Sequence, residues 1–250
     1  MPWVLIAIGL AGGLLSGMFG VGGGIVLVPL LVTFAGLDQR KAAATSLLAI
    51  LPSSIAGSIT YLAHGEVDVL AAVVIAAGAI VGSLIGTRLL KRLPLAWLRW
   101  GFIALLVLVA IRMLFVEPVR GDALAFSPAL AVGYIALGLV MGIASGLFGI
   151  GGGVIAVPAL VALFGVSDLI AKGTSLLVMV PTSVVGTVTN SRNGLVEVRT
   201  GLIVGVAAAV ASVGGSFIAL ALPARLSSIL FAVLLLGITV QLVWKAVRSR

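Results

Sequence analysis

The sequence predicts an all-α integral membrane protein with two inverted-topology repeats, each holding a broken or re-entrant glycine-rich first helix and three spanning helices. Composition gives the first reason: 62% of the 250 residues are hydrophobic, 9% are charged, and the mean hydropathy is +1.35. A soluble domain carries about 25% charged residues, so this chain lacks the polar side chains that a water-exposed surface needs. The second reason is a repeat that covers both halves.

A glycine-rich signature occurs twice, at an offset of 129 residues. Residues 16–29 read Ser-Gly-Met-Phe-Gly-Val-Gly-Gly-Gly-Ile-Val-Leu-Val-Pro, and residues 145–158 read Ser-Gly-Leu-Phe-Gly-Ile-Gly-Gly-Gly-Val-Ile-Ala-Val-Pro, with nine of the fourteen positions identical. The same offset relates the Thr-Ser-Leu-Leu of 45–48 to that of 174–177. Paired helix interruptions at matching places in two halves are typical of transporter binding sites.

The repeat divides the chain into residues 1–117, a turn-rich linker at 118–127, and residues 128–250, which we expect to form one structural domain in the membrane. Each half contains four apolar segments, the last three of them about as long as the ~30 Å of bilayer hydrocarbon requires. The eight segments are 3–35, 42–63, 69–90, 95–115, 129–164, 171–190, 198–222 and 226–244.

The first segment of each half is too long for one span, because helical residues 3–35 would reach about 50 Å at 1.5 Å per residue. Consecutive glycines interrupt it, each costing roughly 1 kcal/mol relative to alanine in a helix. A break inside a membrane frees backbone groups that protein, water or cargo must satisfy. The segment is therefore either a re-entrant hairpin or a long, broken, tilted span.

Charge favours the hairpin. With hairpins the two halves are inverted, and one side of the membrane receives eleven of the fifteen basic residues; with spans the split is eight to seven. The positive-inside rule then makes the protein multi-pass with both termini cytoplasmic. The eleven are Arg40, Lys41, Arg88, Lys91, Arg92, Arg99, Arg192, Arg199, Lys245, Arg248 and Arg250.

The residues inside the membrane favour an anion as ligand. All seven acidic residues lie at segment ends or in loops, so no buried carboxylate marks a cation path. A helix that begins at Ile25 or Val154 points unpaired N–H groups and its positive dipole end at the membrane centre. Glycine lets an oxyanion approach those groups without a Cβ in the way. The predicted binding glycines are Gly22, Gly23, Gly24, Gly151, Gly152 and Gly153.

Close helix packing is the alternative reading of these glycines, since Gly20 and Gly24 fit a small-xxx-small pattern. Packing explains glycines at a four-residue spacing, but three consecutive ones weaken the helix that would pack. Hydroxyls form the second predicted group of ligands, although serine and threonine in membrane helices also bond to carbonyls of their own helix. They are Ser16, Ser145, Thr45, Ser46, Thr174, Ser175, Ser53, Ser54, Thr182 and Ser183.

Other classes of function fit less well. The net charge of +8 comes from basic residues at segment ends, where they set the orientation of membrane spans. They do not form the continuous basic surface that binds nucleic acid. A serine protease would need a histidine at membrane depth, but the single histidine, His64, lies in a predicted loop, so we expect no enzyme. No metal site or cofactor is expected. A passive anion channel and a non-transporting membrane partner remain open alternatives.

The doubled signature resembles that of the TauE/SafE family of sulfite and organosulfonate exporters, together with the Gly-Xaa-Val-Asp/Glu elements at 65–68 and 194–197. The resemblance covers nearly the whole chain. A small departure is Ala44, which precedes the first Thr-Ser-Leu-Leu where Gly173 precedes the second. It implies a prokaryotic plasma-membrane transporter that exports sulfite, sulfoacetate or related sulfur compounds. Members differ in cargo, so the resemblance implies a substrate class. The particular anion, its energy coupling and the oligomeric state are left open.

Overall fold

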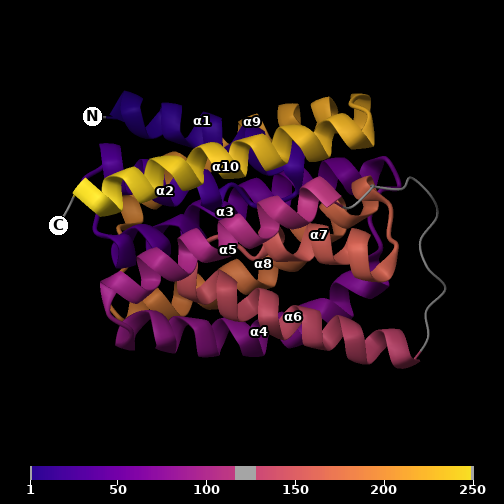
Figure 1. The fold of residues 1–250 in the computed structure, drawn as a ribbon, viewed down its shortest axis with the longest axis horizontal. Helices are drawn as coiled ribbons and strands as arrows, with labels where there is room; N and C mark the ends of the chain where they lie inside the picture. The colour runs from indigo at the N-terminus through magenta and orange to yellow at the C-terminus, as the bar shows by residue number, and fades with distance from the viewer. Residues whose placement is uncertain (1, 116–127, 249–250) are drawn as a thin grey trace.

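The computed structural model describes residues 2–115 and 128–248, and within these ranges every regular element is an α-helix (Figure 1). This confirms the predicted all-helical class; the predicted linker at 118–127 lies outside the described residues. Seven of the described helices are long and apolar enough to cross a membrane. The helices are α1 (Pro2–Phe19), α2 (Gly24–Phe34), α3 (Gln39–Ala63), α4 (Val69–Arg92), α5 (Leu95–Phe115), α6 (Pro128–Phe148), α7 (Gly153–Phe164), α8 (Asp168–Arg192), α9 (Val198–Ala221) and α10 (Ala224–Arg248).

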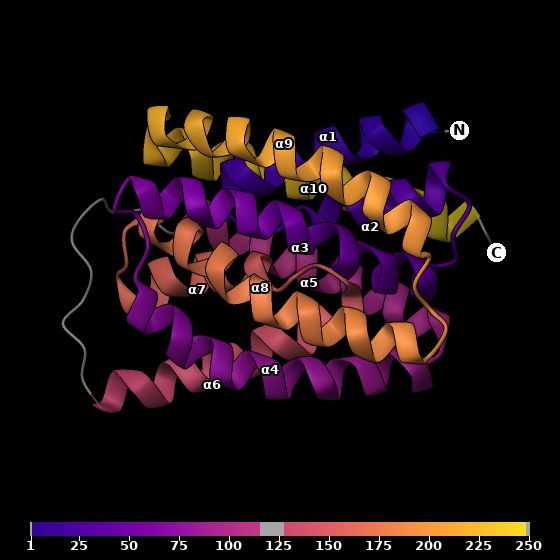
Figure 2. The same ribbon diagram turned by 180° about the vertical axis from the view of Figure 1, so that it is seen from behind.

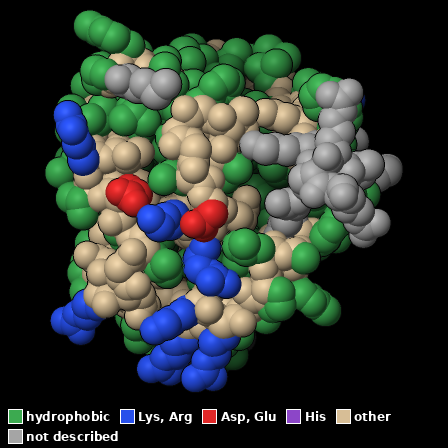
Figure 3. All heavy atoms as spheres, turned by 90° about the vertical axis from the view of Figure 1, so that its left-hand side faces the viewer, with side chains coloured by type: hydrophobic (Ala, Val, Ile, Leu, Met, Phe, Trp, Pro, Cys, Tyr) green, Lys and Arg blue, Asp and Glu red, His purple; other side chains and the backbone are tan. Residues whose placement is uncertain are grey.

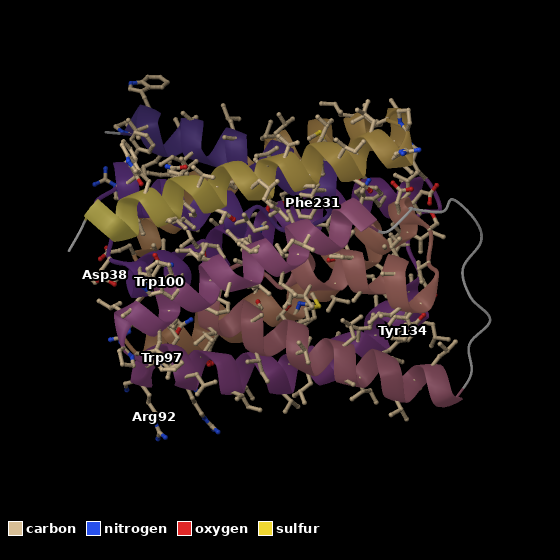
Figure 4. All side chains as sticks on the ribbon, in the orientation of Figure 1. Asp38, Arg92, Trp97, Trp100, Tyr134 and Phe231 are labelled. Carbon is tan, nitrogen blue, oxygen red and sulfur yellow. The ribbon has the colours of Figure 1, made fainter. Side chains whose placement is uncertain are left out.

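The glycine signature splits the first segment of each half into a long and a short helix that form a hairpin. α1 begins at the left of Figure 1, and Asp38, four residues beyond the end of α2, lies at the same end in Figure 4. In the second half, the ring of Tyr134 near the start of α6 packs at a tilt against that of Phe164 at the end of α7, with centroids 4.8 Å apart. In each half, the short helix therefore returns toward the end of the molecule where the long helix begins.

α3 and α8 form the centre of the molecule. Their apolar windows are 67% and 72% buried, against 39–44% for the other candidate spans. Each contains a proline, Pro52 in α3 and Pro181 in α8, and each begins just after one of the hairpins. The side chain of Asp38 caps the start of α3 by accepting hydrogen bonds from the backbone N–H groups of Arg40 and Lys41.

The outer helices pack across the two halves, through glycines. α1 lies against α9, where Gly13 leaves no space for a Cβ beside the backbone of Ala208. α6 lies against α4, where Gly142 meets the backbone of Ala79 in the same way. The two contacts are equivalent in the repeat, because Gly142 lies 129 residues after Gly13 and Ala79 lies 129 residues before Ala208. The contacts between the two halves therefore recur at equivalent positions of the repeat.

The α1–α9 pair and the α4–α6 pair run in opposite directions through the molecule, although the two helices within each pair are parallel. Along α1, glycines 9, 13 and 17 meet residues 204, 208 and 212 of α9 in ascending order, so these two helices are parallel, and α4 and α6 are parallel in the same way. α1 begins at the end of the molecule where α10 ends, whereas α6 begins at the opposite end, near Tyr134 (Figures 1, 2 and 4).

One end of the molecule is rich in basic side chains, and we call it the basic end. Figure 3 views it directly, with Lys and Arg gathered on this face and acidic side chains between them. Arg92 and the exposed Trp97 and Trp100 lie near it in Figure 4, and tryptophan is typical of membrane–water interfaces. The helical flanks expose large apolar side chains such as Val206 and Val210, as a lipid-facing surface requires.

We expect Gly142→Ala to destabilise the folded protein by about 1–3 kcal/mol, because the added methyl overlaps the backbone of Ala79. Gly237→Ala in α10 is the matched control, since nothing lies within 4 Å of its added Cβ. That variant should be neutral or gain up to about 1 kcal/mol of helix propensity. The two variants are compared by thermal melting in detergent, with the monodisperse fraction on size exclusion chromatography measured as a function of temperature. Equal melting temperatures would contradict the packing argument.

Candidate functional site

The centre of the molecule is a crossing of two glycine loops, residues 20–23 and 149–152, each of which joins the two helices of a hairpin. Three glycines in each loop have positive φ, with Gly22 at 73° and Gly151 at 75°. Side chains rarely tolerate this left-handed conformation, which explains why the sequence places glycine there. The glycines of both loops are buried.

The two loops are in direct backbone contact. A Cβ on Gly24 would meet the carbonyl of Gly149, and one on Gly153 would lie 2.5 Å from the carbonyl oxygen of Gly20. Ile50 of α3 and Met179 of α8, which are equivalent in the repeat, both cover Gly22 and Gly151. The structure therefore brings the two predicted glycine triplets together at one place.

Two helices begin at this crossing without a side-chain cap. The N-cap residues of α2 and α7 are Gly23 and Gly152, which have no side-chain oxygen to accept a hydrogen bond from the first turn. Helix starts carry unpaired N–H groups and roughly half a positive charge from the helix dipole. Because Gly24 and Gly153 each lie against the opposite loop, both helix starts lie beside the crossing.

Ser46 and Ser175 attach the crossing to the central helices. The Ser46 hydroxyl donates to the carbonyl oxygen of Gly149 at 2.6 Å, and that of Ser175 donates to the carbonyl oxygen of Gly20 at 2.9 Å. Each serine thus reaches the loop of the other half. These two predicted site residues hold the loop backbone in place.

The predicted threonines Thr45 and Thr174 bond elsewhere. The Thr45 hydroxyl accepts from the backbone N–H of Glu197 at 3.0 Å, and that of Thr174 accepts from the N–H of Asp68 at 2.9 Å. Glu197 and Asp68 immediately precede α9 and α4. These hydroxyls therefore fix the connections into α9 and α4, and the structure does not bring them to the crossing.

The remaining predicted hydroxyls fall into two groups. Those of Ser53, Ser54 and Thr182 donate to carbonyls of their own helices at 2.8–2.9 Å, as hydroxyls beside a helix proline often do. The other group consists of buried hydroxyls that have no hydrogen-bond partner: Ser16, Ser145 and Ser183. Ser16 and Ser145 are equivalent positions, and the carbonyl of each accepts the N–H of the first glycine of its loop.

A buried ion pair beside the crossing was missed by the sequence analysis. Lys172 Nζ lies 2.9 Å from Asp168 Oδ2 and 2.9 Å from Ser227 Oγ of α10, and both charged side chains are about 5% exposed. Lys172 also packs against the backbone of Gly20. The sequence places Lys172 at a segment end, and the signal for the pair is its spacing of four residues, about one helical turn, from Asp168.

Two broken helices that begin at the centre of an apolar helical bundle are typical of multi-pass membrane transporters. Comparison with known families narrows this class. The family model "Sulfite exporter TauE/SafE" matches residues 1–113 and 134–250. The chain belongs to the TauE/SafE family, as the resemblance of its glycine signature predicted.

Several curated relatives have similar sequences. "Probable membrane transporter protein YunE" of Bacillus subtilis is 28% identical over 218 residues, with 78% of this chain and 80% of the relative covered. A "Probable membrane transporter protein" of Xylella fastidiosa strain Temecula1 is 26% identical, with 97% and 96% covered. "Probable membrane transporter protein MamO" of Magnetospirillum gryphiswaldense is 35% identical, but over only 43% of this chain and 18% of the relative. No solved structure matches the chain.

We expect Ser46→Ala and Ser175→Ala each to cost about 1–3 kcal/mol of stability, because a buried carbonyl of a glycine loop loses its donor. Thr239→Ala in α10 is the control, since its hydroxyl bonds only to Leu235 of its own helix. Thermal melting in detergent measures the difference. Serine variants that melt together with Thr239→Ala would show that these bonds do not hold the loops.

Proposed function

We propose that this protein transports small sulfur-containing anions, such as sulfite or organosulfonates, and acts as an exporter. The observation that carries the proposal is the meeting of two uncapped helix starts, those of α2 and α7, at the buried crossing. Unpaired N–H groups and the positive dipole ends make such helix starts anion sites. The family name and the transporter names of the relatives support the same class.

The predicted ligands divide into two roles in this proposal. The backbone of Gly22, Gly23 and Gly24, and of Gly151, Gly152 and Gly153, faces the anion. The unpartnered hydroxyls of Ser16, Ser145 and Ser183 supply further donors. A tetrahedral or pyramidal oxyanion accepts several such bonds at once, and charge-assisted bonds are the strong ones. The other predicted hydroxyls act indirectly, by holding the loops, the proline-containing helices and the connections into α4 and α9.

Neutral donors also suit an anion better than a cation. Among the described residues, no group of three or more His, Asp or Glu side chains gathers in a way that would hold a metal ion. The buried charges beside the crossing, Asp168 and Lys172, are paired with each other at 2.9 Å. We therefore propose transport without a metal or organic cofactor, and we assign the protein no enzymatic step.

In the proposed membrane arrangement, the halves are inverted repeats and the basic end faces the cytoplasm of a prokaryotic cell. α1 and α6 begin at opposite ends of the molecule, and the contacts between halves exchange at an offset of 129 residues. The gathering of Lys and Arg at the end where α1 begins and α10 ends supports a cytoplasmic location by the positive-inside rule. The close backbone contact at the crossing favours alternating access over an open channel.

Proteoliposomes test the cargo. We expect saturable flux of labelled sulfite or a small alkanesulfonate, and a KM raised about tenfold or more by Ser16→Ala combined with Ser145→Ala, because each loses a donor worth about 1.5–3 kcal/mol to a charged group. Thr239→Ala should leave KM unchanged. Non-saturating conductance would establish a channel instead, and cation-selective flux with no response to any sulfur oxyanion would overturn the proposal.

Single cysteines test the orientation, and they are easy to interpret because the chain contains no cysteine. We expect His64→Cys, in the exposed turn between α3 and α4, to react with an impermeant thiol reagent on intact cells. Arg92→Cys at the basic end should react only after permeabilisation. Labelling of Arg92→Cys on intact cells would reverse the proposed orientation.

A further inference from the structure

One face of α8 carries three polar side chains whose hydrogen-bonding atoms are buried and unpartnered: Ser183, Thr187 and Asn190. Their spacing of four and three residues places them in one line along the helix. Ser183 and Asn190 are fully buried, and neither the amide nitrogen nor the amide oxygen of Asn190 has a partner. An unsatisfied buried polar group destabilises the fold, so three such side chains in a line call for a physical reason.

The equivalent face of α3 shows the opposite situation. Its residues at the 129-residue offset are Ser54, Ser58 and Tyr61, and all three side chains are hydrogen-bonded. The two serines donate to carbonyls of their own helix, at 2.9 and 3.0 Å. The buried Tyr61 hydroxyl instead donates to the carbonyl of Gly17 in α1 at 2.8 Å. A phenol therefore joins α3 to α1 in one half, where the other half has an unbonded asparagine.

The unpartnered face of α8 leads from the crossing to the basic end. Met179, one turn before Ser183, covers both glycine loops. At the far end, the carbonyl of Asn190 accepts from the backbone N–H groups of Asn193 and Leu195, in the turn into α9. The side chain of Lys91 reaches this turn, with its Nζ 3.4 Å from Asn193 Oδ1. The line of donors thus ends beside exposed positive charge.

We propose that Ser183, Thr187 and Asn190 form the half-channel along which a small oxyanion moves between the crossing and the basic end. The Tyr61–Gly17 hydrogen bond is the closed gate of the equivalent half-channel, which leads to the opposite end along α3. The identity of the transported anion depends on the proposed function. The half-channel and the gate are inferred from the hydrogen bonds described above. Two hydroxyls and one amide N–H₂ give a moving oxyanion a neutral donor on each successive turn of α8.

Matched single cysteines test the half-channel. Thr187→Cys and Ser58→Cys occupy equivalent positions, and His64→Cys and Arg92→Cys report which side of the membrane the reagent reaches. With a charged thiol reagent on oriented membrane vesicles, we expect Thr187→Cys to react from the Arg92 side at least tenfold faster than Ser58→Cys reacts from either side. Methanesulfonate should slow the modification of Thr187→Cys. It is used in place of sulfite because sulfite reacts with the thiol reagent and methanesulfonate does not. An unreactive Thr187→Cys in protein that is monodisperse on size exclusion would overturn the half-channel.

The gate is tested by Tyr61→Phe, which keeps the ring and removes the hydroxyl that bonds to Gly17. In this background, we expect Ser58→Cys to become at least tenfold more reactive from the His64 side. An unchanged rate in folded protein would overturn the gate. If Thr187→Cys is modified rapidly and no sulfur oxyanion protects it, the half-channel is supported and the proposed cargo is wrong. Failure of the half-channel and failure of the proposed function are therefore distinguishable.

Discussion

The backbone contact between the two glycine loops is the constraint on which the rest of this structure depends. Gly24 and Gly153 approach the opposite loop so closely that neither has space for a Cβ, and each loop is bonded to a serine of the other half. The hairpins stop at the molecular centre because the loops meet there. The starts of α2 and α7 are consequently uncapped, buried and adjacent.

Much of this arrangement was predictable, because the repeat is visible in the sequence. The glycine runs of the repeat predicted where the first segment of each half breaks, the distribution of basic residues favoured the hairpin, and the predicted segment ends lie within a few residues of the observed helices. Hydropathy identified the spans since lipid demands continuous apolar surface. The partners of single side chains were not predictable. Thr45 and Thr174 lie beside Ser46 and Ser175 in the repeated Thr-Ser-Leu-Leu, yet they bond to distant turns.

The departures from symmetry carry the functional information that the repeat conceals. Tyr61 and Asn190 are equivalent in sequence but not in bonding, and the Asp168–Lys172 pair has only Gln39 and Ala43 at the equivalent positions. If the two proposed half-channels were symmetric, the conformation open at one end of the molecule and the conformation open at the other end would be equally stable. Unequal hydrogen bonding in the two halves gives the protein a preferred conformation, and any cargo then acts by shifting that balance.

The exchange of partners between halves also affects how the chain is made. α1 packs on α9, and roughly 180 residues separate the end of one from the start of the other. At about 5–20 residues per second, α1 is synthesised about 10 to 35 seconds before its partner. During that interval its glycine face meets lipid or the insertion machinery. The packing of α1 is therefore completed only after α9, late in the second half of the chain, has been synthesised.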